Sequence, residues 1–443
     1  MIPTESPRHI RLHSATALVI ANMIGTGVFT SLGFQLMGIR DLPAILLLWV
    51  VGGIAALCGA LVYGELGAAM PRSGGEYHYL SKIYHPVVGF LSGWISMTIG
   101  FAAPVALASM AFGSYTARIF PVASPLVFAV AALALISTLH CAGLRIGLMF
   151  QNAVTLMKVL LIAGFIVCGL LLAPRSSMPP FAASFVPSAA TLRDMLSPAF
   201  AVSLIFVSYS YSGWNAAAYI AGEIKNPRIN LPISLWSGTS LVMILYILLN
   251  FTFLKTAPAA ELKGQLEVGY VSAHRIFGPL AGDILSVMIS LLLISSISSM
   301  VFVGPRLIQV VGEDMALFQF LSRRSGRGTP LNAVVFQSTI SLFLILTSTF
   351  EKVLTYVGFT LNLFTFLAVL GVFIHRRKFK DVERPYKTWG FPVVPAVFII
   401  LILWTQVYLL VQRPVQSLAG LATIVSGLVF YGLNAVIEKS QRK

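Results

Sequence analysis

The most constraining feature of this chain is an apolar segment that is interrupted at its centre. Gly25-Thr26-Gly27 lies inside the run from Leu18 to Phe34. A helix that crosses a bilayer needs roughly 20 apolar residues, and glycine costs about 1 kcal/mol against alanine inside a helix. An unwound turn also exposes backbone N–H and C=O groups, which survive in a membrane only beside a cavity or buried in protein. The segment therefore predicts a break with a function.

A second break of the same kind lies at Ser210-Tyr211-Ser212-Gly213-Trp214-Asn215. Interrupted helices at corresponding positions in the two halves of a membrane chain are typical of the substrate site of a secondary transporter. The two breaks together predict a solute carrier.

The composition requires a membrane environment. Of the 443 residues, 57% are hydrophobic and 10% are charged, so the bilayer must be the solvent. The N-terminal apolar run lacks the short core and cleavage site of a cleavable signal peptide. Apolar runs predict twelve spanning helices, near 14–37, 43–70, 87–117, 124–141, 150–173, 198–221, 231–255, 280–304, 331–349, 353–375, 391–411 and 415–437.

The net charge of +15 is explained by topology. With both termini in the cytoplasm, the inner side receives roughly twice as many Lys and Arg residues as the outer side, as the positive-inside rule requires. No nucleic-acid partner is therefore expected. Cys58, Cys141 and Cys168 fall in or next to the predicted spans, so no disulfide framework is expected either.

One membrane transporter domain, 1–443, accounts for the whole chain. The broken helices are the first and sixth spans, so residues 1–173 and 198–375 form two repeats of five spans each. An odd number of spans places the repeats in opposite orientations, as in many secondary transporters. Spans eleven and twelve, residues 391–437, lie outside the repeats. This symmetry follows from the breaks and the number of spans, because the two halves show no convincing similarity of sequence.

The first break has the chemistry of an anion site. Gly25, Thr26 and Gly27 present N–H donors at the start of a half-helix, where the helix dipole favours a carboxylate. The alternative is close packing of helices through small residues. A nucleotide loop is disfavoured, because no strand precedes the glycines and no lysine follows them in Walker spacing.

The second break offers acceptors. Its carbonyl groups can accept hydrogen bonds from an ammonium group, and the Asn215 carboxamide can orient a polar substituent. Tyr209 and Trp214 lie too far inside their span to be interface-belt residues. Donors for a carboxylate at one break and acceptors for an ammonium at the other match the two ends of an α-amino acid. The substrate-binding residues expected at the second break are Tyr209, Ser210, Ser212, Gly213 and Asn215.

Lys158 is the most informative single residue, because apolar residues surround it in the fifth span. An ammonium group at that depth is costly unless it is paired, so it indicates a function. The alternative is a side chain that extends to the interface. Glu65, the only acid predicted inside a span, is expected to be structural rather than a proton relay. No metal-ligand cluster or nucleophile–base pair is visible, so neither an enzyme nor a cofactor is expected.

Five motifs carry a family resemblance. The chain resembles the amino acid–polyamine–organocation superfamily, especially bacterial amino acid permeases and the light subunits of L-type transporters. The motifs are Gly25-Thr26-Gly27-Val28-Phe29, Pro71-Arg72-Ser73-Gly74-Gly75-Glu76-Tyr77, Gly213-Trp214-Asn215 leading into Glu223 to Pro232, Gly304-Pro305-Arg306 and Arg384-Pro385-Tyr386.

The resemblance implies an all-α membrane protein with a LeuT-type fold, in which the substrate lies between the unwound first and sixth spans. The N–H groups of Thr26 and Gly27 resemble the carboxylate site. Tyr209 occupies the position of the family's aromatic gate. The implied ammonium acceptors are the carbonyl groups of Met23, Tyr209 and Ser212.

The resemblance also assigns Lys158. In sodium-independent members, a lysine of the fifth span places its amine where relatives bind sodium. Its implied partners are the Gly25 region and Ser295 or Ser296, with Ser298 or Ser299 if the register shifts. Two departures stand out. Serine stands at position 212, where glycine is frequent, and no cysteine lies between spans three and four, so no disulfide-linked ancillary subunit is expected.

The sequence thus predicts a sodium-independent carrier of neutral α-amino acids in a bacterial-type inner membrane. It would work by alternating access, either as an exchanger or as a proton symporter. A carrier of cationic amino acids or polyamines is the alternative within transport, but it should need a carboxylate near the breaks, and none is visible. A transport-like amino acid sensor or a membrane enzyme would normally add a soluble domain or a polar catalytic cluster.

Overall fold

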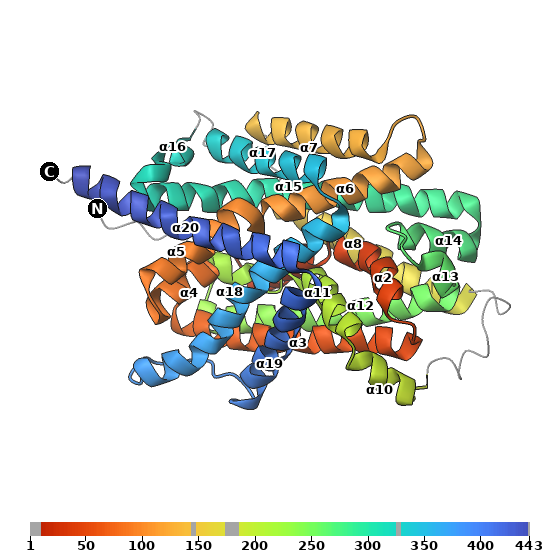
Figure 1. Cartoon of the computed structure of the whole chain (residues 1–443), viewed down its shortest axis with the longest axis horizontal. Coiled ribbons are helices and arrows are strands. Elements are labelled where there is room, and N and C mark those ends of the chain that lie inside the picture. Colours follow the sequence, from red (N-terminus) through yellow and green to blue (C-terminus); the bar gives the residue numbers. More distant parts are fainter. Residues whose placement is uncertain (1–9, 143–147, 173–185, 325–328, 442–443) are drawn as a thin grey trace.

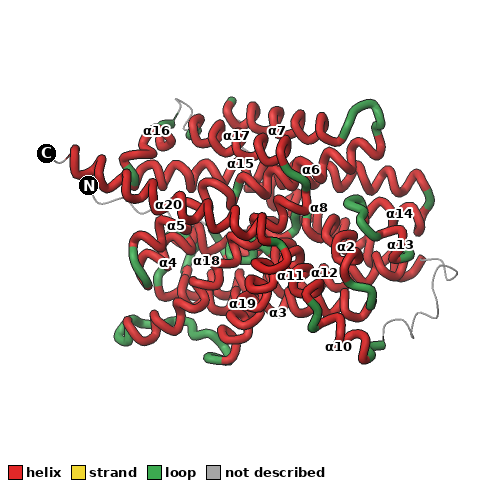
Figure 2. The backbone as a smooth tube through the Cα atoms, viewed as in Figure 1, coloured by secondary structure: helices red, strands yellow, loops and turns green. Residues whose placement is uncertain are grey.

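The computed structural model describes residues 10–142, 148–172, 186–324 and 329–441. In these residues all the regular elements are helices, joined by short loops (Figures 1 and 2), apart from one isolated β-bridge between Ile10 and Ile224. The predicted all-helical class is therefore confirmed. Residues 1–9 and 173, at the ends of the predicted first repeat, lie outside the described residues.

The first half of the chain contains α1 (Leu12–Met23), α2 (Gly27–Gly38), α3 (Leu42–Ala69), α4 (Gly75–Ile83), α5 (Pro86–Ile95), the π-helix η1 (Ser96–Gly100), α6 (Ala102–Ile119), α7 (Pro125–Cys141) and α8 (Leu148–Leu172). The remainder contains α10 (Ala189–Met195), α11 (Pro198–Tyr211), η3 (Ala216–Glu223), α12 (Pro227–Thr256), α13 (Ala259–Leu262), α14 (Val268–Phe277), α15 (Pro279–Asp314), η4 (Ala316–Phe318), α16 (Gln319–Ser322), α17 (Leu331–Thr347), α18 (Phe350–Lys378), α19 (Val393–Gln412) and α20 (Pro414–Gln441).

All twelve predicted runs coincide with helical segments. Among the described residues nine helices are long and apolar enough to cross a membrane, or ten if the bent pair of Ala189–Met195 and Pro198–Glu223 counts as one span. The two helices α7 and α17 have only 17 residues each, and they were the shortest predicted runs. The exact number of crossings and the inverted repeat therefore stay predictions.

Both breaks lie where the sequence places them. In the first, α1 ends at Met23 and α2 begins at Gly27. In the second, α11 ends at Tyr211, and Gly213 has a φ of +96° before the 3-10 helix η3 begins. Such a φ suits glycine, which has no Cβ.

The two broken helices touch through their backbones. A Cβ on Gly27 would lie 2.4 Å from Ser210 Oγ, and a Cβ on Gly213 would lie 2.8 Å from the carbonyl carbon of Asn22. The hydroxyl oxygens of Ser31 and Ser210 are 3.1 Å apart. These close approaches hold the two breaks side by side.

The long helices run along one direction, which gives the bundle two ends (Figure 1). One end carries α4, α16 and the 379–392 loop between α18 and α19, and we call it the α4 end. The opposite end carries α10, α13 and α14. Backbone hydrogen bonds from Ile10 N to Glu223 O (3.0 Å) and from Gly74 N to Tyr219 O (3.1 Å) fasten the α4 end to η3.

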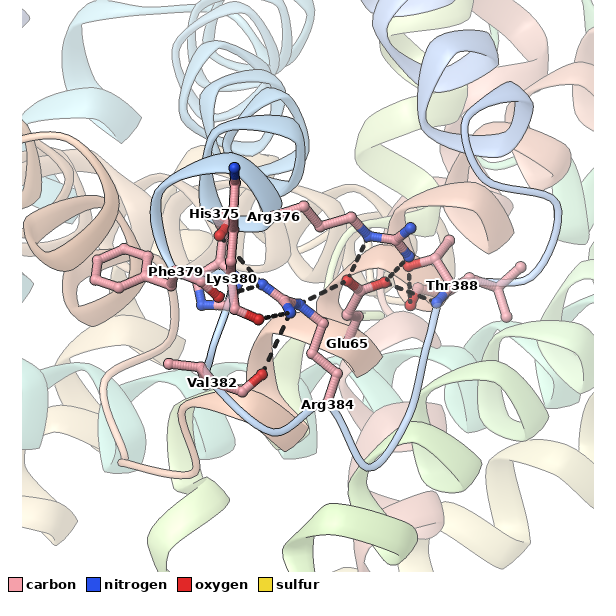
Figure 3. Close-up of polar contacts among 9 residues, drawn as sticks. Glu65, His375, Arg376, Phe379, Lys380, Val382, Arg384 and Thr388 are labelled. Atoms are coloured by element: carbon pink, nitrogen blue, oxygen red, sulfur yellow. Dashed lines mark hydrogen bonds and ion pairs between the residues drawn. The ribbon is translucent and has the colours of Figure 1, made fainter.

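An ion-pair cluster joins α3 to the loop after α18, as Figure 3 shows. The Glu65 carboxylate is fully buried and accepts two hydrogen bonds from Arg376, of 2.8 and 2.7 Å. Arg384 Nε lies 3.9 Å away, and the Thr388 N–H donates to the same carboxylate at 2.7 Å. We call these four residues the Glu65 cluster. Its two arginines agree with the structural role expected for Glu65.

Candidate functional site

A cavity of about 1250 Å³ lies between the two breaks. Its walls come from both breaks, from α6 and from α15, and they continue through Ser14, Arg72 and Glu223 toward the α4 end. Among the described residues, none that lines it belongs to α10, α13 or α14. The cavity therefore opens toward the α4 end. A concave, mostly apolar space with a few polar groups is the usual form of a small-molecule site.

The first break presents N–H donors to this cavity. Gly25, Thr26 and Gly27 all line it, and no side chain caps the N-terminus of α2, so the first N–H groups of the helix have no intrahelical partner. A Cβ on Gly25 would find its nearest atom 3.9 Å away, whereas Gly27 is pressed against Ser210. Gly25 therefore borders open space, and Gly27 combines a cavity position with a packing role.

The three carbonyl groups implied as ammonium acceptors, those of Met23, Tyr209 and Ser212, differ in how many hydrogen bonds they already accept. The Met23 carbonyl already accepts hydrogen bonds from the Tyr246 hydroxyl at 2.6 Å and from Gly25 N at 2.8 Å, which occupy both lone pairs. The Tyr209 carbonyl accepts one bond, from Ser212 N at 2.9 Å. Tyr209 and Ser212 therefore remain the more available of the three acceptors for an ammonium group.

Some of the remaining residues of the second break make contacts within the protein, and others line the cavity. The Ser210 hydroxyl donates to the Phe206 carbonyl at 2.8 Å, which ties it to its own helix. The Tyr209 hydroxyl approaches the Thr26 side chain across the site, and both residues line the cavity. Ser212, Gly213 and Asn215 all line the cavity.

Lys158 connects the first break to α15. Its side chain lies in α8, is 2% exposed, and donates to the Ile24 carbonyl at 3.0 Å and to Ser296 Oγ at 2.9 Å. Both contacts lie inside the protein, so the side chain does not extend to an interface. Of the serines expected as partners, Ser296 makes the contact. Ser298 instead lies 2.8 Å from His140 Nε2, and Ser295 Oγ is buried without a partner in the described residues.

Glu76, which was not among the site residues expected from the sequence, lies beside the second break. Its carboxylate is 4% exposed, lines the cavity, and accepts hydrogen bonds from the Tyr63 hydroxyl at 2.6 Å and from Asn215 Nδ2 at 2.9 Å. The Tyr219 hydroxyl also interacts with it. The expectation that no acidic side chain lies near the breaks is therefore wrong, since Asn215 belongs to the second break.

The backbone explains why Glu76 reaches the break. Gly74 and Gly75 have φ values of +121° and +51°. These values turn the chain so that the start of α4 packs against η3. A Cβ on Gly75 would lie 2.9 Å from the Tyr219 ring. Because glycine has no Cβ, the backbone of Gly75 can lie against this ring. Burial raises the pKa of the Glu76 carboxyl to about 7, although its hydrogen bonds to Tyr63, Asn215 and Tyr219 act in the opposite direction.

Comparison with known proteins places the chain in a family. The sequence profile of a family described as amino acid permease matches residues 10–433. The chain belongs to the amino acid permease family. Among its curated relatives is the b(0,+)-type amino acid transporter 1 of Homo sapiens, 30% identical over 97% of this chain and 88% of the relative. The mouse protein of the same name is 29% identical over the same shares. The large neutral amino acids transporter small subunit 2 of Mus musculus is 27% identical over 96% of this chain and 81% of the relative.

These matches confirm the resemblance drawn from the five motifs. The permease is a multi-pass membrane protein of a family of amino acid transporters, not an enzyme. Among the described residues, no group of three or more His, Cys, Asp or Glu side chains could hold a metal ion.

Proposed function

We propose that this permease binds an α-amino acid across the two breaks and carries it by alternating access without sodium. The uncapped N-terminus of α2 and the carbonyl groups of Tyr209 and Ser212 border one cavity, and this observation carries the proposal. The N–H groups of Thr26 and Gly27 receive the carboxylate, where the helix dipole favours negative charge. The carbonyl groups receive the ammonium.

Lys158 supports independence from sodium. Its ammonium group donates to the carbonyl of Ile24 in the first break and to Ser296 of α15, so it contributes a fixed positive charge between two helices. A bound cation held by the same oxygen atoms would do the same. Tyr209, which spans the breaks through Thr26, serves as the aromatic gate that excludes water from the occluded substrate. Both exchange and proton symport are compatible with this arrangement.

Neutral amino acids are the proposed substrates. The Glu76 carboxylate, the acid that touches the second break, is 4% exposed and its Oε1 already accepts hydrogen bonds from Tyr63 and Asn215, which restricts its access to a substrate cation. Cationic amino acids are a second candidate, because Glu76 does line the cavity. Polyamines, which lack a carboxylate, would leave the N–H groups of the first break unused.

The membrane setting follows from the charge distribution. We place the α4 end, which carries Arg376, Arg377 and Lys378, in the cytoplasm according to the positive-inside rule. Twelve spans in two inverted repeats of five plus two, in a bacterial-type inner membrane, complete the proposed arrangement. The 120–124 loop between α6 and α7 contains no cysteine, so a disulfide-linked ancillary subunit is not part of it.

A panel of ligand analogues tests recognition of both ends. The purified full chain is titrated in a thermal-shift assay with neutral and cationic L-amino acids, with their amides, with the matching acids that lack the amino group, and with spermidine. We expect neutral L-amino acids to raise the melting temperature, and the amides and deaminated acids to have no effect. Stabilisation by the amides or by spermidine would contradict the assignment of the carboxylate site.

A further inference from the structure

Glu76 is surrounded by neutral groups on every side that packs against it. From α3 it meets the Tyr63 hydroxyl, from the second break the Asn215 amide, and from η3 the Tyr219 hydroxyl. On α4 itself, Tyr79 interacts electrostatically with Glu76. Among the described residues no cation forms an ion pair with Glu76.

The cations of the neighbouring elements are directed elsewhere. Arg376 of α18 and Arg384 of the following loop bind Glu65. Arg72 precedes α4 and Lys82 lies in its last turn, and both act on His78. A buried carboxylate that is held only by neutral donors keeps the option of binding a proton, whereas a carboxylate paired with arginine does not.

We propose that Glu76 is a proton-binding site that positions Asn215, so that proton binding at Glu76 opposes substrate binding at the two breaks. The inference rests on the proposed function, because it concerns the affinity of the same cavity. Glu76 acts through Asn215 and is therefore a positioning residue. The proton comes from water in the cavity, which Glu76 lines and which opens toward the α4 end.

The hydrogen-bond inventory gives the direction of the effect. Oε1 of the carboxylate accepts hydrogen bonds from the Tyr63 hydroxyl and from Asn215 Nδ2 at once. With Asn215 Nδ2 committed to Glu76, the amide oxygen remains to accept a hydrogen bond from the substrate. Both donors bind Oε1, so the proton binds Oε2, and Oε1 of the neutral carboxyl accepts a weaker hydrogen bond than Oε1 of the ionised carboxylate. Asn215 is therefore held less firmly when Glu76 binds a proton.

The titration range of this group suits such a role. Burial raises its pKa to about 7, where small changes of pH alter its charge. By linkage, a substrate that binds best to the ionised form must release the proton, and its apparent affinity falls as the pH falls.

The test measures the dissociation constant of a neutral amino acid against pH. The probe is whichever of L-alanine, L-serine, L-leucine and L-phenylalanine gives the largest thermal shift with the full-length protein. From about pH 7.5 to about pH 5.5 the wild-type dissociation constant should rise about fivefold or more. In Glu76→Gln it should change by less than about twofold and lie near the wild-type value at low pH.

Further variants separate this account from a merely structural role. Glu76→Asp retains a titratable group and should keep the pH dependence. Tyr63→Phe removes a donor to the ionised form and should move the midpoint upward by about one pH unit. Glu223→Gln removes another carboxylate that lines the same cavity and should leave the profile unchanged.

The outcomes distinguish two failures. A dissociation constant that stays flat with pH in the wild type, or a slope that persists in Glu76→Gln, would overturn the inference while leaving the proposed function standing. If Glu76→Gln does not fold, the upward shift in Tyr63→Phe decides, and an unchanged midpoint in that variant overturns the inference. Absence of binding by every amino acid tested would instead contradict the proposed function.

Discussion

Glu65 and Glu76 lie on the two sides of the short connection between α3 and α4, and both carboxylates are buried. Glu65 is held by Arg376, Arg384 and a backbone N–H. Glu76 is held by hydroxyl and amide donors alone. The Glu65 cluster does not line the cavity, whereas Glu76 does. In this molecule the carboxylate with the structural role, Glu65, is paired with arginines. The carboxylate beside the candidate binding site, Glu76, is not paired with any arginine in the described part of the chain.

Lys158 extends the comparison to a buried cation. It is held by a carbonyl and a hydroxyl oxygen, and among the described residues no carboxylate forms an ion pair with it. Burying a charge without an opposite charge is costly, so a buried charge of this kind indicates a functional role. The two regions therefore differ in what a mutation should change: stability at the Glu65 cluster, and transport or its pH dependence at the breaks.

The largest effect is expected from Glu65→Gln. It leaves Arg376 and Arg384 without their carboxylate in a buried setting, and breaking a buried pair in this way typically costs about 3–5 kcal/mol. We expect a large fall in melting temperature and in the yield of monodisperse protein. The matched control is Glu351→Gln, because Glu351 pairs with Arg413 at 2.6 Å in a more exposed position, where ion pairs contribute about 0–1 kcal/mol. Equal melting temperatures for the two variants would break the comparison.

Next in size is the loss of transport in Lys158→Ala. Removing the ammonium disconnects the first break from Ser296, so we expect transport to fall about tenfold or more while the protein remains folded. Lys255→Ala serves as the control, because Lys255 donates to the Leu170 carbonyl of the same helix α8, away from the breaks. Normal exchange by Lys158→Ala in proteoliposomes would refute the role given to this lysine.

A smaller effect separates the two glycines of the first break. A methyl group on Gly27 would overlap Ser210, whereas one on Gly25 would enter open space. Gly27→Ala should therefore lower stability by about 1–3 kcal/mol through overpacking and weaken binding as well. Gly25→Ala should leave the melting temperature unchanged and weaken binding alone. Gly27→Leu would exaggerate the packing clash, so Gly25 is the cleaner probe of the carboxylate site. Unchanged affinity in Gly25→Ala would contradict that site.

The smallest effect concerns stability and pH at Glu76. Its pKa is raised from 4.5 to about 7 in the folded protein, so the stability associated with the neutral form is present below pH 4.5 and is lost as the pH rises through about 7. The melting temperature of wild type relative to Glu76→Gln should therefore fall by a few degrees between about pH 5 and about pH 8. A constant difference across this range would show that Glu76 keeps one protonation state.

The sequence predicted the features that depend on local pattern. Apolar runs located the helices, and glycines flanked by polar residues located both breaks, because hydrocarbon penalises irregular backbone wherever it occurs. The sequence left four serines between Ser295 and Ser299 as possible partners of Lys158, and Ser296 makes the contact. The predicted eighth span ended at residue 304, but α15 continues to Asp314, because Pro305 is accommodated within the helix.

The features that escaped prediction depend on tertiary contacts. Glu76 belongs to one of the five motifs, but the sequence around it does not predict that α4 packs against η3. The glycine pair before it was the one signal that could have suggested this turn, since both residues adopt positive φ. The occupied Met23 carbonyl was equally hidden, because Tyr246 reaches it from a helix that is distant in sequence.

The central claim is tested most directly by counterflow in proteoliposomes with choline replacing sodium on both sides. The liposomes are loaded with the unlabelled amino acid that gives the largest thermal shift, and uptake of the same labelled amino acid is followed. The account predicts transient accumulation in wild type without sodium, no accumulation in Lys158→Ala and normal accumulation in Lys255→Ala. Wild-type counterflow that requires sodium, or that is absent for every amino acid in the panel, would contradict it.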